Sequence, residues 1–269
     1  MKKRIMIYLL ITTMIGLFFY AFKIEPKRIV RQHYVLGKKN EQAPLRIVQL
    51  SDIHIKKDYS IEQLEKIVAK VNAEQPDIIT FTGDLFDNYG NYGPSEAVLS
   101  ALSKLSAPLG KFAVWGNHDY GGAASRVYPE ILAAVGFQLL ENAGTTISLS
   151  NQKSIYIAGL DDSLLGDASL STALTERQGA YTILLTHEPD IAANLLDQNI
   201  QLVLAGHSHG GQIRIPFFSI KNTLAKNYDK GLYELANNTT LYVNSGLGTT
   251  KISARFRVPP EIAVFDLYL

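Results

Sequence analysis

The chain has 269 residues, a formal net charge of +1 and 19 % charged residues. This length suits one large α/β catalytic domain with an anchor, and the balanced charge gives no basic surface that would indicate nucleic acid as a partner. The absence of cysteine excludes disulfides, thiolate catalysis and cysteine-based zinc sites, so any bound metal must be held by nitrogen and oxygen atoms.

The N-terminus departs from the composition of a soluble domain. Three basic residues, 2–4, precede an uncharged run of 18 residues from Ile5 to Phe22. As a helix that run is about 27 Å long, close to the roughly 30 Å of a bilayer's hydrocarbon core. A cleaved signal peptide would need a shorter apolar region and a small-x-small cleavage site, and residues 18–24 contain none. We therefore predict an uncleaved, single-pass membrane anchor over residues 1–24. Positive charges flank the run on both sides, so the side of the membrane that carries the domain stays open.

The next stretch, residues 25–44, is polar and basic, and it predicts a juxtamembrane linker or a first irregular strand. The catalytic domain is expected over residues 45–269, where β-rich runs alternate with amphipathic helical stretches. The expected strands cover residues 45–50, 78–82, 112–115, 146–149, 155–158, 182–185, 202–204, 231–235, 240–243 and 262–267. The expected helices cover residues 61–72, 95–105, 126–135, 170–174 and 191–196. This alternation indicates an α/β sandwich whose first strands are parallel and buried, with ligands bound at their carboxyl ends.

Polar clusters follow five of the expected strands. They are Ser51–His54, Gly83–Asp87, Gly116–Asp119, Thr186–Glu188 and Gly206–Gly211, and they contain five of the six histidines. A single aspartate at a strand end is usually a turn or a helix cap, and a single histidine is usually a hydrogen-bonded polar residue. Because five such clusters occur together in one alternating fold, a shared site is the better interpretation.

The spacing within the clusters is suitable for chelation. In an extended segment residues i and i+2 point to the same side, so Asp52 and His54 can hold one ion, and His207 and His209 can face one site. Glycines at positions 83, 116 and 206 adjoin these positions and leave room for tight turns near the metals.

A set of metal ligands made of aspartate, histidine and asparagine, without cysteine, favours Mn, Fe, Zn or Ni over Mg or Ca. The supply of donors exceeds six, which suits two ions roughly 3.5–4 Å apart that share a carboxylate. Such a pair clamps a phosphoryl group and lowers the pKa of a bridging water. Because metal-bound histidines usually donate their second N–H to an acceptor, Asp87, Asp119 and Glu188 are candidate outer partners.

Five motifs follow one another between Asp52 and His209. They are D-x-H, G-D-x-x-D, G-N-H-D, a single histidine after a strand, and G-H-x-H. In this combination and order they resemble the calcineurin-like metallophosphoesterase family. The forms G-D-L-F-D and G-H-S-H-G-G-Q, with the tail Pro259–Ile262, resemble the branch that has an N-terminal membrane segment. The resemblance implies a four-layer α/β/β/α sandwich with a two-metal site between its sheets.

The resemblance also implies roles for individual residues. One ion would be held by Asp52, His54 and His209, the other by Asn117, His187 and His207, with Asp84 bridging the two. His118 would face the leaving group as a general acid or phosphate-stabilising donor, oriented by Asp119. Asp87 lies outside the family's usual ligand set.

These features predict a hydrolase of phosphodiesters or pyrophosphates that acts on a membrane-associated substrate. The membrane branch is associated with cleaving the pyrophosphate of a UDP-2,3-diacylglucosamine lipid A precursor, which is the most concrete substrate candidate. A phosphomonoesterase or protein phosphatase is the alternative within enzymes. A catalytically silent membrane scaffold is disfavoured because no ligand is missing. No obligate protein partner is predicted.

Two further groups of residues are candidates for contacts with the substrate. Basic residues that could hold its far end are Arg214, Lys251, Arg255 and Arg257, with plain surface charge as the alternative. Phe217 and Phe218 predict either an apolar lip that meets lipid or part of the core.

Overall fold

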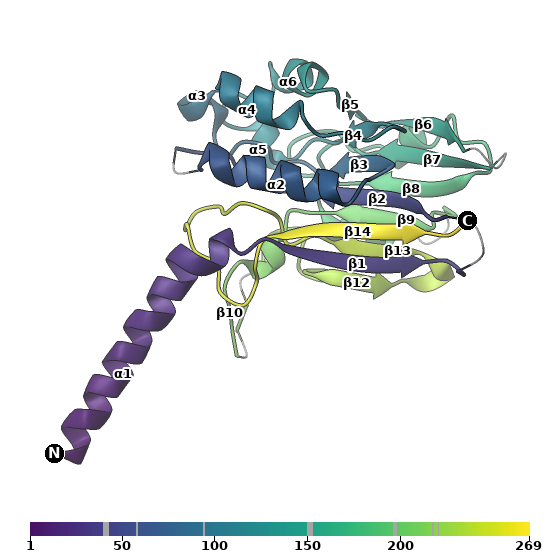
Figure 1. Cartoon of the computed structure of the whole chain (residues 1–269). Coiled ribbons are helices and arrows are strands. Elements are labelled where there is room, and N and C mark those ends of the chain that lie inside the picture. The colour runs from purple at the N-terminus through teal and green to yellow at the C-terminus, as the bar shows by residue number, and fades with distance from the viewer. Residues whose placement is uncertain are drawn as a thin grey trace.

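The computed structural model describes residues 1–39, 43–57, 59–93, 95–149, 153–195, 198–216, 218–219 and 221–269. The N-terminal helix α1 (Lys2–Phe19) continues through a π-helical turn η1 (Tyr20–Ile24) and a 3-10 turn η2 (Glu25–Lys27). Helix α1 has no buried residue and projects away from the folded domain (Figure 1). By length and composition the Lys2–Lys27 segment is able to cross a membrane.

Within the described residues, the domain contains two mixed six-stranded sheets and a small hairpin. The first sheet has the order β1 (Val30–Leu36), β14 (Glu261–Leu267), β2 (Leu45–Leu50), β3 (Ile78–Phe81), β4 (Lys111–Ala113), β5 (Gln138–Leu139). The second has the order β12 (Gly231–Glu234), β13 (Thr240–Val243), β9 (Leu202–Ala205), β8 (Tyr181–Leu185), β7 (Ser154–Gly159), β6 (Ala143–Ser148). The hairpin pairs β10 (Arg214–Ile215) with β11 (Phe218–Ser219).

The helices are short apart from α2 (Ile61–Ala73), whose N-cap Ser60 accepts a hydrogen bond from the Gln63 backbone. The others are α3 (Tyr89–Tyr92), α4 (Glu96–Leu102), α5 (Asn117–Tyr120), α6 (Tyr128–Ala134), α7 (Leu170–Ala173) and the 3-10 turns η3 (Pro189–Asn194), η4 (His209–Gly211) and η5 (Ala236–Asn238). Helices α2, α4 and α6 supply apolar side chains to one outer core, and α7 and η3 supply them to another.

Three buried clusters define four layers. In β2, Val48 packs under the first set of helices, whereas its neighbour Ile47 packs between the sheets, because successive side chains of a strand point to opposite faces. The inter-sheet cluster also contains Ile183 of β8 and Tyr242 of β13, and the third cluster lies on the outer face of the second sheet. The α/β/β/α sandwich expected from the sequence is confirmed.

The first strands are parallel, as expected: β2 pairs with β3, and β3 with β4. The stretch 25–44, for which a linker or an irregular strand was open, contains the regular strand β1, which runs parallel to β14 over seven residue pairs. Most of its side chains are exposed, so it lacks the apolar alternation that reveals a half-buried strand. The expected helix near residues 191–196 is the 3-10 turn η3, and residue 196 lies outside the described part of the chain.

Candidate metal centre

The carboxyl ends of strands from both sheets meet at one place. Backbone hydrogen bonds join the loops: Asp52 N–H donates to the Gly83 carbonyl (3.0 Å), and Leu247 N–H donates to the Ser51 carbonyl (3.0 Å). The first of these ties the loops after β2 and β3, and the second ties the loop after β13 to the loop after β2. This network brings the polar clusters of the two sheets together, as expected for strands that end at a shared edge.

One group of side chains consists of Asp52, His54 and His209, all of them buried. Asp52 Oδ1 lies 3.4 Å from His209 Nε2 and 3.8 Å from His54 Nε2. The two Nε2 atoms are themselves 3.0 Å apart. Since metal–imidazole bonds are about 2.0–2.1 Å long, these atoms are close enough to share one ion.

A second group contains His187 and His207, whose rings are 5.0 Å apart, together with Glu188. Asp84 lies between the two groups, with its Oδ2 atom 3.3 Å from both His54 Nε2 and His187 Nε2. The carboxylate of Asp84 therefore faces histidines of both groups.

Hydrogen bonds determine which nitrogen of each histidine faces the site. His187 Nδ1 donates to the Thr82 carbonyl (2.6 Å), and His207 Nε2 donates to the Thr223 carbonyl (2.8 Å). A carbonyl only accepts, so the opposite nitrogen of each ring is left as a donor for a metal. His54 Nδ1 instead lies 3.4 Å from Asp87 Oδ1. Of the three carboxylates expected as outer partners, Asp87 lies against the ring of His54, whereas main-chain carbonyls accept from the rings of His187 and His207.

Asp119 does not orient His118, contrary to the expectation. Its carboxylate accepts backbone hydrogen bonds from Asp84 (2.7 Å), Leu85 (2.9 Å) and Gly116 (3.0 Å). His118 is held differently: Nδ1 donates to the Asp87 carbonyl (2.7 Å), and the backbone N–H donates to Asp84 Oδ1 (2.8 Å). Asp119 therefore shapes the loop that carries Asp84, whereas Asp87 orients His118.

Two pairs of candidate ligands lie in turns rather than in extended chain. The backbone φ angles are 50° at Asp52, 48° at His54, 65° at His207 and 50° at His209, all in the left-handed region that L residues seldom adopt. Asp84, at 61°, shares this conformation. The expected extended geometry of the two i, i+2 pairs was wrong. Because such strain clusters at functional sites, it supports a functional role for these loops.

Glycine at positions 116 and 206 is required by close approach. A Cβ atom at Gly116 would lie 2.4 Å from Asp84 Oδ1, and one at Gly206 would lie 2.0 Å from Ser51 Oγ and 2.6 Å from Asp52 Oδ2. Any larger residue would displace these carboxylates. The expectation that these glycines make room beside the site is confirmed.

Burial and mutual charge shift the titration of the site. Burial acts against ionisation of Asp84, but His187 and His54 beside it hold its pKa well below the usual range. Burial also acts against the charged form of His54, yet Asp52 and Asp87 raise its pKa to about 9. Burial lowers the pKa of His209 and raises that of Glu188 to about 8. Burial, together with the charge of Asp84, raises the pKa of Asp119 to about 7.

The residues present are suitable for divalent metal ions. Buried atoms without a hydrogen-bond partner among the described residues include Asp52 Oδ1, Asn117 Oδ1 and His187 Nε2. Buried polar atoms are rarely left unpaired, so this concentration requires an explanation. Nitrogen and oxygen donors of this kind suit divalent metal ions.

A cavity of about 210 Å³ opens over these groups, lined by Asp84, Asn117, His118 and His207. Asn222 and Thr223 also line it, and Asn222 donates to the His207 carbonyl (2.8 Å). Sequence reasoning missed both, because an Asn-Thr pair remote from every motif is typical of an ordinary turn.

Of the four basic candidates, Lys251 lines the cavity. The prediction that Arg255 contacts the substrate was wrong. Its side chain is fully buried and donates to the backbone carbonyls of Ser245, Gly246, Gly248 and Val258. Arg214 is paired with Asp229, and Arg257 is exposed outside the cavity lining. Of the expected lip, Phe217 lies outside the described residues, and the side chain of Phe218 is likewise not described.

The sequence model of the Calcineurin-like phosphoesterase family matches residues 45–211. This match covers all five strand-end clusters and more than half of the chain. The chain belongs to the calcineurin-like phosphoesterase family, and it is a metal-dependent phosphoric ester hydrolase.

Relatives extend the likeness over nearly the whole chain. The uncharacterized metallophosphoesterase YkuE of Bacillus subtilis is 39 % identical over 92 % of this chain and 88 % of its own length. The UDP-2,3-diacylglucosamine pyrophosphatase LpxG of Chlamydia trachomatis is 31 % identical over 91 % of both chains. A Danio rerio transmembrane protein with a metallophosphoesterase domain is 30 % identical over 94 % of this chain and 60 % of its own length.

Among solved structures, a dimetal phosphatase from Danio rerio is similar with a TM-score of 0.51 over 84 % of this chain and 94 % of that chain. The two are 12 % identical, so the likeness concerns the fold alone.

Proposed function

We propose that the chain is a two-metal phosphodiesterase or pyrophosphatase that acts on a substrate presented by a membrane. In this proposal Asp52, His54 and His209 hold one ion, Asn117, His187 and His207 hold the other, and Asp84 bridges them. The observation that carries it is the position of Asp84 Oδ2, equally distant from a histidine of each group. The unpaired buried atoms around it support the same assignment.

The chain's own residues have distinct tasks in hydrolysis. Two divalent ions bound there would polarise the phosphoryl group and lower the pKa of water so that it supplies the nucleophile. His118 is about 30 % exposed at the cavity, and its Nδ1–H is held by the Asp87 carbonyl. In the doubly protonated ring, Nε2–H is left to donate a proton to the leaving oxygen. Lys251 and Asn222 line the same cavity and are placed to contact the rest of the substrate.

A membrane anchor at the N-terminus is part of the proposal. The apolar helix projects from the domain, and its end is tied to the catalytic loops, since Arg255 N–H donates to the Ala21 carbonyl (2.9 Å). Residues 250 and 251 of the same loop line the catalytic cavity. The cavity thus lies close to the bilayer end of the domain, which favours a lipid-linked substrate. The likeness to LpxG makes UDP-2,3-diacylglucosamine the first lipid to test.

The test uses the full chain in bilayer nanodiscs, stripped by chelation and reloaded with Mn, Fe, Zn or Ni. We expect turnover of bis(p-nitrophenyl) phosphate to exceed that of the monoester and to depend on metal, with release of UMP from UDP-2,3-diacylglucosamine. Faster turnover of the monoester would replace the diesterase assignment with a phosphomonoesterase. Two bound ions without turnover of any of these substrates would contradict the proposed activity.

A further inference from the structure

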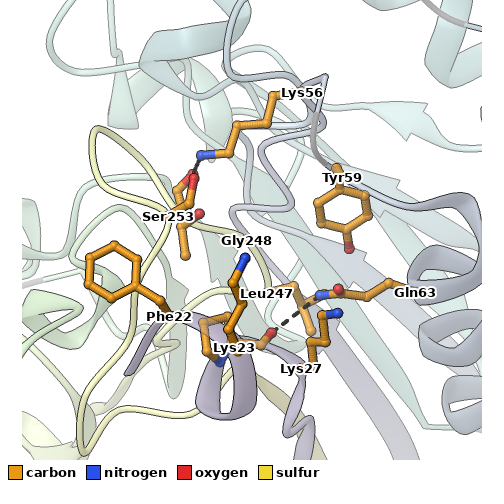
Figure 2. Close-up of a pocket in the computed structure, with 11 residues that line it drawn as sticks. Phe22, Lys23, Lys27, Lys56, Tyr59, Gln63, Leu247, Gly248 and Ser253 are labelled. Carbon is orange, nitrogen blue, oxygen red and sulfur yellow. Dashed lines mark hydrogen bonds between the residues drawn. The ribbon is translucent and has the colours of Figure 1, made fainter. Parts of the chain in front are cut away.

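A second cavity, of about 510 Å³, lies between the end of the anchor and the catalytic domain (Figure 2). The anchor contributes Phe22, Lys23 and Lys27, and the domain contributes Lys56, Tyr59 and Gln63. Its volume is within the roughly 300–1,000 Å³ of small-molecule sites. Neither the metal centre nor the proposed reaction uses it.

The lining is cationic. It includes three lysines and no aspartate or glutamate among the described residues. The nearby Glu25 is buried, and its Oε1 accepts a hydrogen bond from Val258 N–H (2.6 Å). Lys23 and Lys27 are exposed, and neither forms an ion pair within the described part of the chain. Such a cavity selects an anion.

The walls are fixed, and one polar atom in them lacks a partner. Gln63 Nε2 donates to the Pro26 carbonyl (3.3 Å), which ties α2 to the anchor. Lys56 Nζ donates to the Thr249 carbonyl (2.5 Å), which ties the opposite wall. Tyr59 Oη is buried and has no hydrogen-bond partner among the described residues. A hydroxyl in this position is available to donate to an anionic oxygen of a ligand.

The position of the cavity along the anchor identifies the source of the anion. The uncharged run ends at Phe22, and the first basic residues after it, Lys23 and Lys27, line the cavity. If the run lies in the hydrocarbon core, these lysines lie at the depth of the lipid headgroups. Phe22 and Leu247 add apolar surface for the part of a lipid next to its headgroup.

We propose that this cavity binds the phosphate-bearing headgroup of an anionic phospholipid from the same bilayer. Lys23, Lys27 and Lys56 surround the phosphate, and Tyr59 Oη donates to it. The site rests on the proposed membrane anchor, but it does not depend on the substrate or on the metals.

The full chain is extracted from nanodiscs containing phosphatidylglycerol and phosphatidylcholine in equal amounts, and the retained phospholipid is identified by native mass spectrometry. We expect the wild type to retain phosphatidylglycerol preferentially. Lys27→Gln should lower retention about fivefold, the effect of one lysine near an anionic headgroup. Tyr59→Phe, which removes the hydroxyl alone, should also lower it. The matched control is Arg28→Gln, which removes an equal charge one residue away but outside the lining, and retention should stay near the wild-type value.

Equal retention of both lipids by the wild type, or equal loss in Lys27→Gln and Arg28→Gln, would overturn the proposal. Displacement of the lipid by millimolar glycerol phosphate would mean that a soluble phosphate is the ligand, and would overturn it as well. Resistance of the protein to carbonate extraction from membranes tests the anchor, and turnover of the nitrophenyl diester tests the enzyme. Failure of either is therefore distinguishable from failure of the lipid site.

Discussion

His54 and His207 belong to the same candidate metal centre, but different acceptors lie beside their rings. The ring of His54 lies beside a carboxylate of Asp87, whereas the ring of His207 donates to the main-chain carbonyl of Thr223. His187 resembles His207, since it donates to the Thr82 carbonyl. A carboxylate adds negative charge and can be removed by one substitution, but a carbonyl persists whatever side chain the residue carries. We call the part around His54 the carboxylate half and the part around His187 and His207 the carbonyl half. Substitutions should therefore weaken the carboxylate half more easily than the carbonyl half.

Asp84→Asn should have the largest effect because Asp84 faces both halves. Loss of its charge leaves His54 and His187 without their shared carboxylate. We expect a loss of turnover of about a thousandfold or more, beyond the roughly 10–100-fold typical of an outer partner. Bound metal, measured by mass spectrometry of the digested protein, should fall below two ions per chain. Retention of both ions would show that Asp84 does not join the two halves.

His118→Ala should come next, and its effect should depend on the leaving group. Removal of a general acid costs about 10²-fold or more where the leaving oxygen is basic. Against bis(p-nitrophenyl) phosphate, whose leaving group needs little protonation, the loss should be smaller, and bound metal should be unchanged. An equal loss of kcat for good and poor leaving groups would exclude the proton-donor role.

Asp87→Asn isolates the carboxylate half. The substitution keeps the main-chain carbonyl that orients His118 but weakens the acceptor beside His54. We expect metal affinity to fall by about 10–100-fold, as for other outer partners. The measurement is a competition titration with a chelator, with the leaving-group dependence of kcat as a readout that should stay unchanged.

Asp119→Asn tests the loop beneath Asp84. An amide cannot accept three backbone N–H groups as the carboxylate does. The free energy of unfolding should therefore fall by about 1–3 kcal/mol, with Tm falling about 2–4 °C per kcal/mol. The matched control is Asp190→Asn, because Asp190 also accepts three backbone N–H groups, from residues 226–228. Both variants should lose stability, but only Asp119→Asn should lower metal affinity. Equal metal affinity in the two would limit Asp119 to a general stabilising role.

Thr223→Ala should have the smallest effect. The partner of His207 is the backbone of this residue, and the exposed side chain is not needed for that hydrogen bond. Metal affinity should stay within about twofold of the wild type, well under the roughly 10–100-fold expected for an outer partner. A loss as large as that of Asp87→Asn would mean that side chains hold both halves and would remove the contrast between them.

Sequence alone predicted the fold, because strand alternation is a local signal, and the polar clusters at strand ends named side chains that the structure brings together. It left open whether residues 25–44 form a linker or an irregular strand, because the side chains of β1 are mostly exposed and its pairing with β14 is visible only in three dimensions. It also gave Asp119 the wrong partner and Arg255 the wrong role. Backbone carbonyls and N–H groups take part in those contacts, and a residue's type does not show where the main chain of a distant segment lies.

The position of β14 between β1 and β2 affects how the protein is made. The strand that separates the first two strands of the chain is the last to be synthesised, since it covers Glu261–Leu267. At about 5–20 residues per second, Leu267 follows Leu50 from the ribosome by roughly 10–40 s. During that interval one edge of β2 lacks its final partner, and β1 cannot join the sheet. A nascent chain truncated before residue 261 would leave both strands with open edges, beside a helix already able to enter a bilayer.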